Sequence, residues 1–160
     1  MKIMIFTEGT IIMHKHGKGK TRAEIVKQVE EKDNKKQIYD FASYVPIGKA
    51  VEKIKKWKKN GAEIIYLTSR RKSKEIEAVA NVLKKYKFPK GELLFRKRLE
   101  SYKKIAERVI PDVLIEDDCE SIGGEKEMTI THIKPSIRAK IKSIPIKEFG
   151  GIDHLPDKID

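Results

Sequence analysis

The chain of 160 residues and 18.5 kDa has the length of one domain. Lysine and arginine outnumber aspartate and glutamate by 36 to 24, for a formal net charge of +12, and 39% of the residues are hydrophobic. No apolar run approaches the roughly 20 residues of a membrane-spanning helix, and the single cysteine, Cys119, excludes an intrachain disulfide and a cysteine-built zinc site. With no signal-peptide pattern at its start, the sequence predicts a cytoplasmic protein without a membrane partner.

The positive charge is mostly lysine, and it is spread over helix-like segments such as residues 53–59. This distribution favours solvated helix faces over a nucleic-acid surface, which would concentrate arginine and aromatic residues on one face. Nucleic-acid binding is kept as the alternative. In either case a pI near 9.6 predicts attraction to partners that carry phosphate.

Hydrophobic runs of strand length alternate along the chain with helical patterns. Strands are predicted at residues 3–6, 64–68, 92–95, 113–115, 128–133 and 144–147, and helices at residues 46–60, 76–83 and 102–110. Pro145 places the last strand at a sheet edge, because proline cannot donate to a ladder. The alternation predicts an α/β fold, a three-layer sandwich with a mostly parallel, Rossmann-like sheet.

Residues from about 11 to 45 interrupt this alternation. They hold a stretch rich in glycine, lysine and histidine, followed by a charged helical piece at residues 23–31. We interpret the segment as a small cap-like insertion after the first strand of a single domain that spans residues 1–160. His14 and His16 are interpreted as exposed or phosphate-contacting residues of this stretch, with a metal pair or proton shuttle as the alternative.

Polar residues follow three of the predicted strands, at 7–10, 68–70 and 116–118. Ligands of open parallel sheets bind at the carboxyl ends of the strands, so these residues are expected at one edge. Lys103 and Lys104 begin the helix before the acidic strand. Carboxylates, hydroxyls and lysine together suit phosphate chemistry with Mg²⁺. The basic turn at residues 96–98 is interpreted as surface.

The order of these motifs resembles that of the haloacid dehalogenase-like (HAD) phosphohydrolases over residues 1–133. The first motif of that family, Asp-x-Asp-Gly-Thr, is matched by Phe6-Thr7-Glu8-Gly9-Thr10. Its second motif, a threonine or serine after a hydrophobic strand, is matched by Thr68 and Ser69, with Arg70 next. The resemblance implies a HAD-type sheet and phosphohydrolase activity of the phosphatase or nucleotidase type.

The third motif of the family, a lysine near the start of a later helix, is best matched by Lys103, with Lys104 and Lys97 as alternatives. The fourth, an acidic cluster, is matched by residues 116–118. The resemblance assigns catalysis to Glu8, Thr68 and Lys103. It assigns substrate binding to Thr7, Gly9, Thr10, Ser69 and Arg70, and a weak Mg²⁺ site to Glu8, Glu116, Asp117 and Asp118.

One residue departs from the family pattern. The nucleophilic aspartate of the family falls on Phe6, which cannot form a covalent phosphate intermediate. A shifted register would make Glu8 the nucleophile, but the Gly9-Thr10 match argues against it. Two functions follow: an Mg-dependent phosphohydrolase with an altered site, or a non-catalytic HAD-fold module that binds a phosphorylated ligand, a nucleic acid or a protein. The expected partner is a small phosphorylated molecule or nucleotide, and nucleic acid is the alternative.

Overall fold

The computed structural model describes residues 1–31 and 35–160, and its centre is a five-stranded sheet in the order β5-β4-β1-β6-β7. All neighbouring strands in this sheet are parallel. The strands are β1 (Lys2–Phe6), β4 (Glu63–Leu67), β5 (Glu92–Leu94), β6 (Val113–Asp117) and β7 (Lys142–Ile146). The sequence-based prediction that Pro145 lies in an edge strand is confirmed, since β7 ends the sheet.

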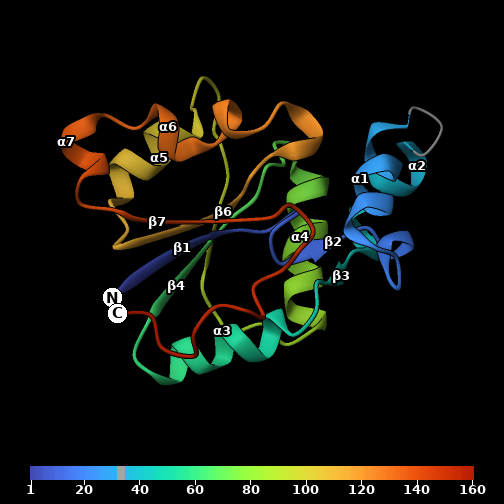
Figure 1. Cartoon of the computed structure of the whole chain (residues 1–160), viewed down its shortest axis with the longest axis horizontal. Helices are drawn as coiled ribbons and strands as arrows, with labels where there is room; N and C mark the ends of the chain where they lie inside the picture. Colours follow the sequence, from blue (N-terminus) through green and yellow to red (C-terminus); the bar gives the residue numbers. More distant parts are fainter. Residues whose placement is uncertain (32–34) are drawn as a thin grey trace.

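Helices cover both faces of the sheet, as Figure 1 shows. One face carries α3 (Ala50–Lys59) and α4 (Ser73–Lys85), and the other carries α5 (Tyr102–Val109), α6 (Thr129–His132) and α7 (Pro135–Arg138). Strand β1 supplies both cores because its side chains alternate: Ile3 and Ile5 face α3 and α4, whereas Met4 and Phe6 face α5. The predicted three-layer α/β sandwich is therefore confirmed.

Helix α3 illustrates how the pattern of the sequence produces the packing. Its apolar residues recur on one face, and Ile54 and Trp57 are almost fully buried. The indole Nε1 of Trp57 donates to the carbonyl of Pro156, 2.9 Å away, so the end of the chain packs along this helix. The helix begins at Ala50 and not at Pro46, as the sequence suggested, because Pro46 belongs to a short strand.

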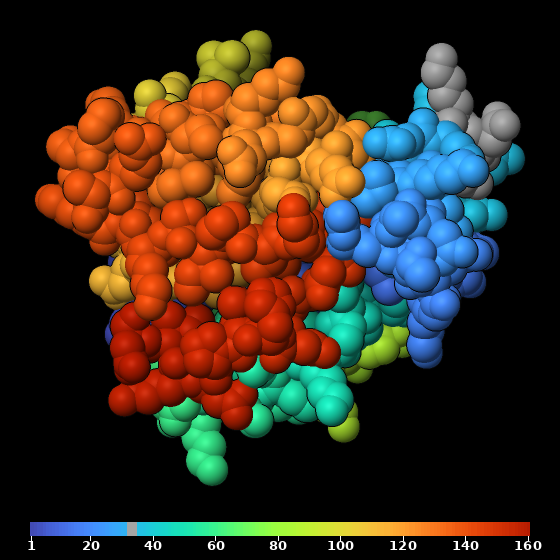
Figure 2. Space-filling model, in the orientation of Figure 1, coloured from blue at the N-terminus to red at the C-terminus, as the bar shows by residue number. Residues whose placement is uncertain are grey.

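That short strand, β3 (Val45–Pro46), pairs antiparallel with β2 (Ile12–Met13) and closes the segment between them. This segment carries α1 (Arg22–Glu30) and α2 (Lys35–Ile38) and lies beyond the carboxyl ends of the sheet strands (Figure 1). In Figure 2 it packs directly against the body of the molecule, where Arg22 pairs with Glu120. Its description as a cap stays an interpretation.

The predicted strand at residues 128–133 is wrong, because these residues form the short helix α6. The backbone N–H groups of Thr129 and Ile130 at its start donate to the carboxylate of Glu116, at 2.7 and 2.9 Å. Met128 and Ile133, which look strand-like in the sequence, are buried at the two ends of the helix. A long-range hydrogen bond from a neighbouring strand thus decides the local conformation.

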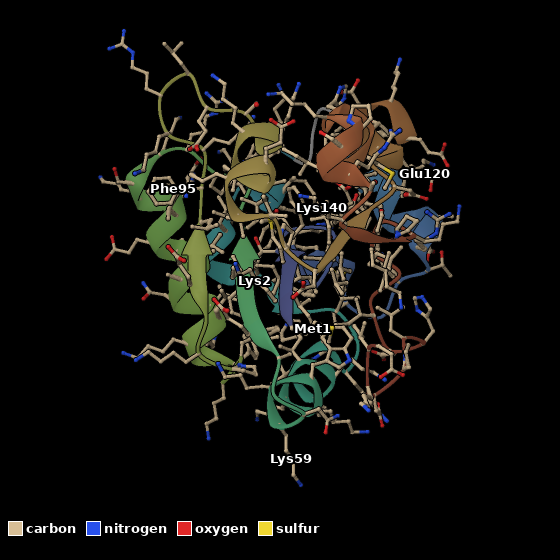
Figure 3. All side chains as sticks on the ribbon, turned by 90° about the vertical axis from the view of Figure 1, so that its left-hand side faces the viewer. Met1, Lys2, Lys59, Phe95, Glu120 and Lys140 are labelled. Carbon is tan, nitrogen blue, oxygen red and sulfur yellow. The ribbon has the colours of Figure 1, made fainter. Side chains whose placement is uncertain are left out.

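Charged side chains project outward over much of the surface, as at Lys59 in Figure 3. The part of the chain that the structure describes contains no helix that is long and apolar enough to cross a membrane.

Candidate functional site

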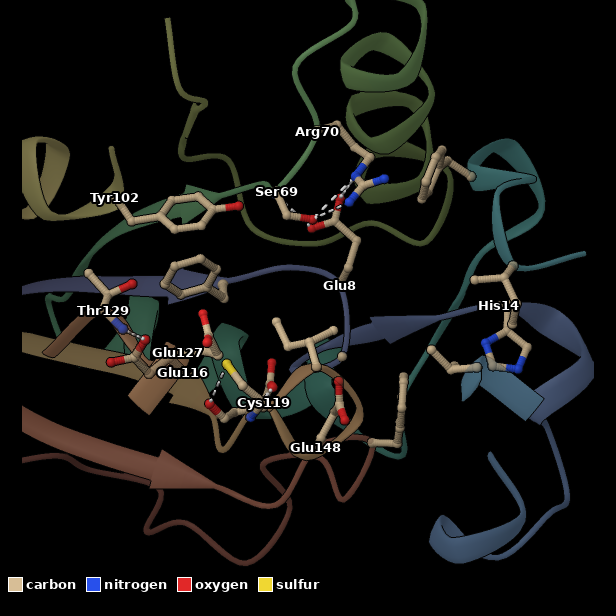
Figure 4. Close-up of a pocket in the computed structure, with 18 of the residues that line it drawn as sticks. Glu8, His14, Ser69, Arg70, Tyr102, Glu116, Cys119, Glu127, Thr129 and Glu148 are labelled. Atoms are coloured by element: carbon tan, nitrogen blue, oxygen red, sulfur yellow. Dashed lines mark hydrogen bonds and ion pairs between the residues drawn. The ribbon is translucent and has the colours of Figure 1, made fainter. Parts of the chain in front are cut away.

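A cavity of about 810 Å³ lies at the carboxyl ends of the sheet strands, between the body and the inserted segment. Its lining comes from the ends of β1, β4 and β6, from the segments after β5, β6 and β7, from the start of α5 and from the insertion. Figure 4 shows how these side chains converge. This is the edge where the polar residues after the predicted strands were expected to meet.

Glu8 occupies the centre of this edge, and both of its carboxylate oxygens are bound. Oε1 accepts the Thr68 hydroxyl at 2.5 Å. Oε2 accepts the Ser69 backbone N–H at 3.1 Å and the Thr7 hydroxyl at 2.6 Å. Arg70 adds a longer ion pair, with its Nε 3.9 Å from Oε1. The glutamate carboxylate therefore sits on the donors that the resemblance would give to a phosphate group.

One side of the cavity is basic and consists of Ser69, Arg70, Arg96, Tyr102 and Lys103, which we call the basic wall. Arg70 donates to the Ser69 hydroxyl from both Nε and a terminal nitrogen, at 3.2 and 2.8 Å. Arg96 donates to the Ser69 carbonyl at 3.2 Å and stacks 4.1 Å from the centre of the Tyr102 ring. Arg70 and Arg96 thus both donate hydrogen bonds to Ser69.

Arg96 retains hydrogen-bonding capacity at this wall. Within the described residues its Nε is buried and has no hydrogen-bond partner. Burial lowers the pKa of the Arg96 guanidinium, and repulsion from Arg71 and Arg70 acts in the same direction. A buried N–H without an acceptor costs free energy, about 1–3 kcal/mol, and an anion at this wall would offset the repulsion between the guanidinium groups.

The opposite side of the cavity is acidic and consists of Glu116, Asp117 and Glu148, which we call the acidic wall. Each carboxylate is nearly buried and is bound by the chain itself. Glu116 caps the start of α6, Asp117 accepts the Thr10 hydroxyl and the Cys119 N–H, and Glu148 accepts the N–H and hydroxyl of Ser121.

Burial raises the pKa of all three carboxyl groups of the acidic wall. Repulsion from Asp117 adds to this effect at Glu116 and Glu148, whereas the hydrogen bonds of the chain act in the opposite direction. Gly9 fits beside this wall because it has no side chain: at its φ of +79° a Cβ would lie 3.1 Å from Oδ2 of Asp117.

Phe6 lies between the two walls and belongs to the core under α5. It is 9% exposed, and its ring packs edge-to-face on Tyr102 with the ring centres 5.0 Å apart. The position that the resemblance gives to a nucleophile is therefore filled by an apolar side chain with a packing role.

Some of the predicted site residues line the cavity, and the others do not. Those that line the cavity are Glu8, Gly9, Ser69, Arg70, Lys103, Glu116 and Asp117. The others take part through hydrogen bonds: Thr7 and Thr68 to Glu8, Thr10 to Asp117, and Asp118 to the backbone N–H of Glu148. Their catalytic and binding roles stay predictions.

Among the three candidate lysines, Lys103 lines the cavity, with its Nζ 3.9 Å from Glu107 of the same helix. Lys97 and Lys104 are exposed and do not line it. The place of Lys103 in the first turn of α5 explains this difference, since the next residue of a helix points about 100° away.

The structure corrects the surface position expected for Arg96 and the exposure expected for His14, whereas the phosphate contact suggested for the histidines stays a prediction. Arg96 belongs to the basic wall and not to a surface turn. His14 is 1% exposed and lines the cavity, with its Nε2 2.9 Å from Oε1 of Gln28, whereas His16 is exposed. Burial lowers the pKa of His14, which makes the neutral imidazole the stable form. Glu148 and Tyr102 were missed altogether, because a tail glutamate and a helix tyrosine carry no local signal.

Three of the predicted magnesium ligands accept hydrogen bonds from the chain itself. The described residues contain no group of three or more His, Cys, Asp or Glu side chains that could hold a metal ion. Glu8, Glu116 and Asp117 each direct their oxygens to donors of the chain. Mg²⁺ keeps several waters in most protein sites and takes only one or two carboxylates, so these hydrogen bonds do not decide whether it binds. Magnesium binding stays a prediction, and no step below depends on it.

No family model matches the chain, and no curated protein matches it significantly. Among solved structures, the chain is similar to one in the "Structure of the Pnkp1/Rnl/Hen1 RNA repair complex", with a TM-score of 0.55 and 14% identity. The match covers 91% of this chain and 42% of that chain, so this chain spans less than half the length of its structural neighbour. At this identity the likeness concerns the fold alone.

Proposed function

We propose that the chain is a HAD-like protein that binds a small phosphate-bearing ligand in the cavity and does not form an aspartyl-phosphate intermediate. The order of the motif-like residues along the chain supports this, because Glu8 and Thr68 follow β1 and β4, Asp117 ends β6, and the three strands are neighbours in the sheet. Because β1 lies between β4 and β6, residues that follow it contact both neighbours: Glu8 accepts from Thr68, and Thr10 donates to Asp117.

The observation that carries the proposal is the position of Arg96 beside a second arginine, with one donor that has no acceptor. Its guanidinium lines the cavity beside Arg70, and both are attached to Ser69. Nε of Arg96 has no acceptor among the described residues. A phosphate group offers several acceptor oxygens and a charge that offsets the repulsion between the two arginines, and guanidinium groups bind such oxygens in pairs.

The ligand is expected at the basic wall and not in the cradle at Thr68 and Ser69. That cradle is already filled by the carboxylate of Glu8, which accepts from both residues. A second anion there would meet a like charge at hydrogen-bond distance. The basic wall lies inside a cavity, whereas the lysines are spread along the chain, and both facts favour a small molecule over a nucleic-acid chain as the partner.

A slow phosphohydrolase is the second candidate, and the position of Glu8 favours it. Glu8 lines the cavity, and Lys103 does so too. In this alternative Glu8 acts as a general base or nucleophile without the family's aspartate. Three donors weaken that role, because they already occupy the carboxylate oxygens that would have to take a proton or attack phosphorus. We therefore rank binding above hydrolysis.

The test is calorimetric titration with glycerol phosphate, ribose 5-phosphate and nucleoside monophosphates, each paired with its unphosphorylated counterpart. We expect the wild type to bind phosphate esters and not the counterparts. Arg96→Gln removes charge-assisted hydrogen bonds worth about 1.5–3 kcal/mol, so affinity should fall about tenfold to 100-fold. Arg108→Gln is the matched control, since Arg108 is exposed, pairs with Glu100 and lies outside the cavity.

Absence of binding by every ester, or equal binding by the wild type and Arg96→Gln, would overturn the proposal. A phosphate-release assay with the same esters separates the two candidates. Turnover by the wild type that disappears in Glu8→Gln would assign hydrolysis to Glu8, whereas binding without release supports the non-catalytic function.

A further inference from the structure

An aromatic platform lies beside the basic wall, at the mouth of the cavity. It consists of Tyr39, Phe41 and Tyr44, all of which line the cavity. Phe41 and Tyr44 are buried, with exposed fractions of 4% and 6%, but 58% of Tyr39 is exposed. The rings follow one another, with centres 6.1 Å apart from Tyr39 to Phe41 and 5.1 Å apart from Phe41 to Tyr44.

A hydrogen bond and a 3₁₀ turn fix the backbone around the aromatic platform. The Tyr44 hydroxyl donates to the carbonyl of Ile38 at 2.6 Å, which ties the end of α2 to the ring behind it. A 3₁₀ turn at Phe41–Ser43 fixes the backbone between the rings, and this turn packs on α4. Tyr39, which is 58% exposed, therefore lies between two fixed segments of backbone, the end of α2 and the 3₁₀ turn, and this lowers the cost of ordering it when a ligand binds.

Arg70 joins the platform to the basic wall. Its guanidinium lies 4.5 Å from the centre of the Phe41 ring, and the same side chain donates to Ser69. With 6.1 Å between the Phe41 and Tyr39 rings, Arg70 lies no more than about 11 Å from the Tyr39 ring. Anion donors and an exposed ring face thus stand within the span of one small molecule.

The volume of the cavity argues that the ligand is more than a phosphate group. At about 810 Å³ it falls in the range of drug-sized ligand sites, about 300–1,000 Å³. A sugar phosphate would leave the aromatic platform uncovered, whereas a planar base would cover it. Stacking of a base on an aromatic ring tolerates any base, since every base has a π-face.

We propose that the cavity selects a free nucleoside monophosphate, with its base stacked on Tyr39 and its phosphate at Arg70 and Arg96. This inference rests on the proposed function and adds the class of ligand. Tyr39 is a specificity residue in this arrangement, and Arg96 is the anchor of the phosphate. Stacking does not distinguish a pyrimidine from a purine, so any preference between them depends on other contacts.

The experiment compares uridine and adenosine monophosphates with ribose 5-phosphate and inorganic phosphate by calorimetric titration of the full chain. We expect the nucleotides to bind at least about tenfold more tightly than ribose 5-phosphate. Tyr39→Ala should reduce nucleotide affinity to that of ribose 5-phosphate, and Tyr39→Phe should retain it. Leu99→Ala is the control for loss of an exposed apolar side chain, since Leu99 is 85% exposed and lies outside the cavity.

Equal affinity of the wild type for nucleotides and ribose 5-phosphate would overturn this inference but leave the proposed function intact. So would a Tyr39→Ala variant that binds nucleotides as the wild type does. Failure of every phosphate ester to bind would overturn both. A 5′-phosphorylated RNA oligonucleotide that binds far more tightly than the mononucleotides, through Tyr39, would overturn the choice of a free nucleotide.

Discussion

The two walls of the cavity differ in how their charges are satisfied. On the acidic wall, Glu116 accepts two backbone N–H groups and Glu148 accepts two donors of Ser121. On the basic wall, Arg96 makes one hydrogen bond among the described residues and leaves its Nε without an acceptor. The charges of the acidic wall are thus satisfied by the chain itself, whereas Arg96 on the basic wall is repelled by Arg70 and Arg71 and keeps a buried donor without an acceptor.

Phe6 lies between the walls, and its replacement should have the largest effect on stability. Phe6→Asp removes a buried ring from the core under α5 and places a carboxylate beside Tyr102. We expect the free energy of unfolding to fall by about 3–5 kcal/mol, as for Phe-to-Ala changes in cores. Chemical denaturation measures this, with Phe6→Leu as an apolar control that should lose much less. An unchanged stability of Phe6→Asp would contradict the packing role.

The second prediction contrasts one residue from each wall. Glu116→Ala leaves the N–H groups of Thr129 and Ile130 without an acceptor, so the free energy of unfolding should fall by about 2–3 kcal/mol. Arg96→Ala should change it by less than about 1 kcal/mol, because it also removes an unpaired buried donor. Urea unfolding of the two variants compares them directly. Similar losses in both would remove the distinction between a structural wall and a binding wall.

Glu8→Gln should strengthen binding of phosphate esters, because it removes a negative charge next to Arg70. Charges about 4 Å apart near a protein surface interact by about 4 kcal/mol, and a ligand farther away should gain about tenfold in affinity. Titration with ribose 5-phosphate measures the change. The matched control is Glu127→Gln, an exposed carboxylate that also lines the cavity. Weaker binding by Glu8→Gln would assign Glu8 to the ligand site itself.

The smallest expected effect is on the pH dependence of stability. Burial raises the pKa of Glu116, so the folded chain binds a proton more readily than the unfolded chain. The stabilisation by this proton is complete below the ordinary glutamate pKa and is lost as pH rises through the raised value. The difference in melting temperature between wild type and Glu116→Gln should therefore grow in favour of the wild type between pH 7 and pH 4. A constant difference would show that Glu116 does not titrate in this way.

The sheet was predictable because β1, β4 and β6 are separate buried runs, and because helices with one apolar face alternate with strands from α3 to β6. The edge position of β7 followed from one proline. Residues 128–133 could not be assigned from local pattern, because the carboxylate of Glu116, 13 residues away from Thr129, provides the cap that starts α6. A short apolar run fits either conformation until such a partner is known.

The candidate site was predictable only where it follows strands. Glu8, Ser69 and Asp117 come directly after β1 or β4 or at the end of β6, so topology alone brings them together. Arg96 and Tyr102 reach the cavity through packing of the loop after β5 on the start of α5, a contact that no spacing rule reports. The hydrogen bond between Thr68 and Glu8 could not be predicted either, since both residues were expected to face a ligand.

The claim that the basic wall binds the ligand is tested most directly by a crystal structure of the chain with a nucleoside monophosphate. We predict phosphate oxygens within about 3 Å of guanidinium nitrogens of Arg96 and Arg70, with Glu8 still bound to Thr68. A phosphate located at the acidic wall, or in the Thr68 and Ser69 cradle with Glu8 displaced, would contradict the account.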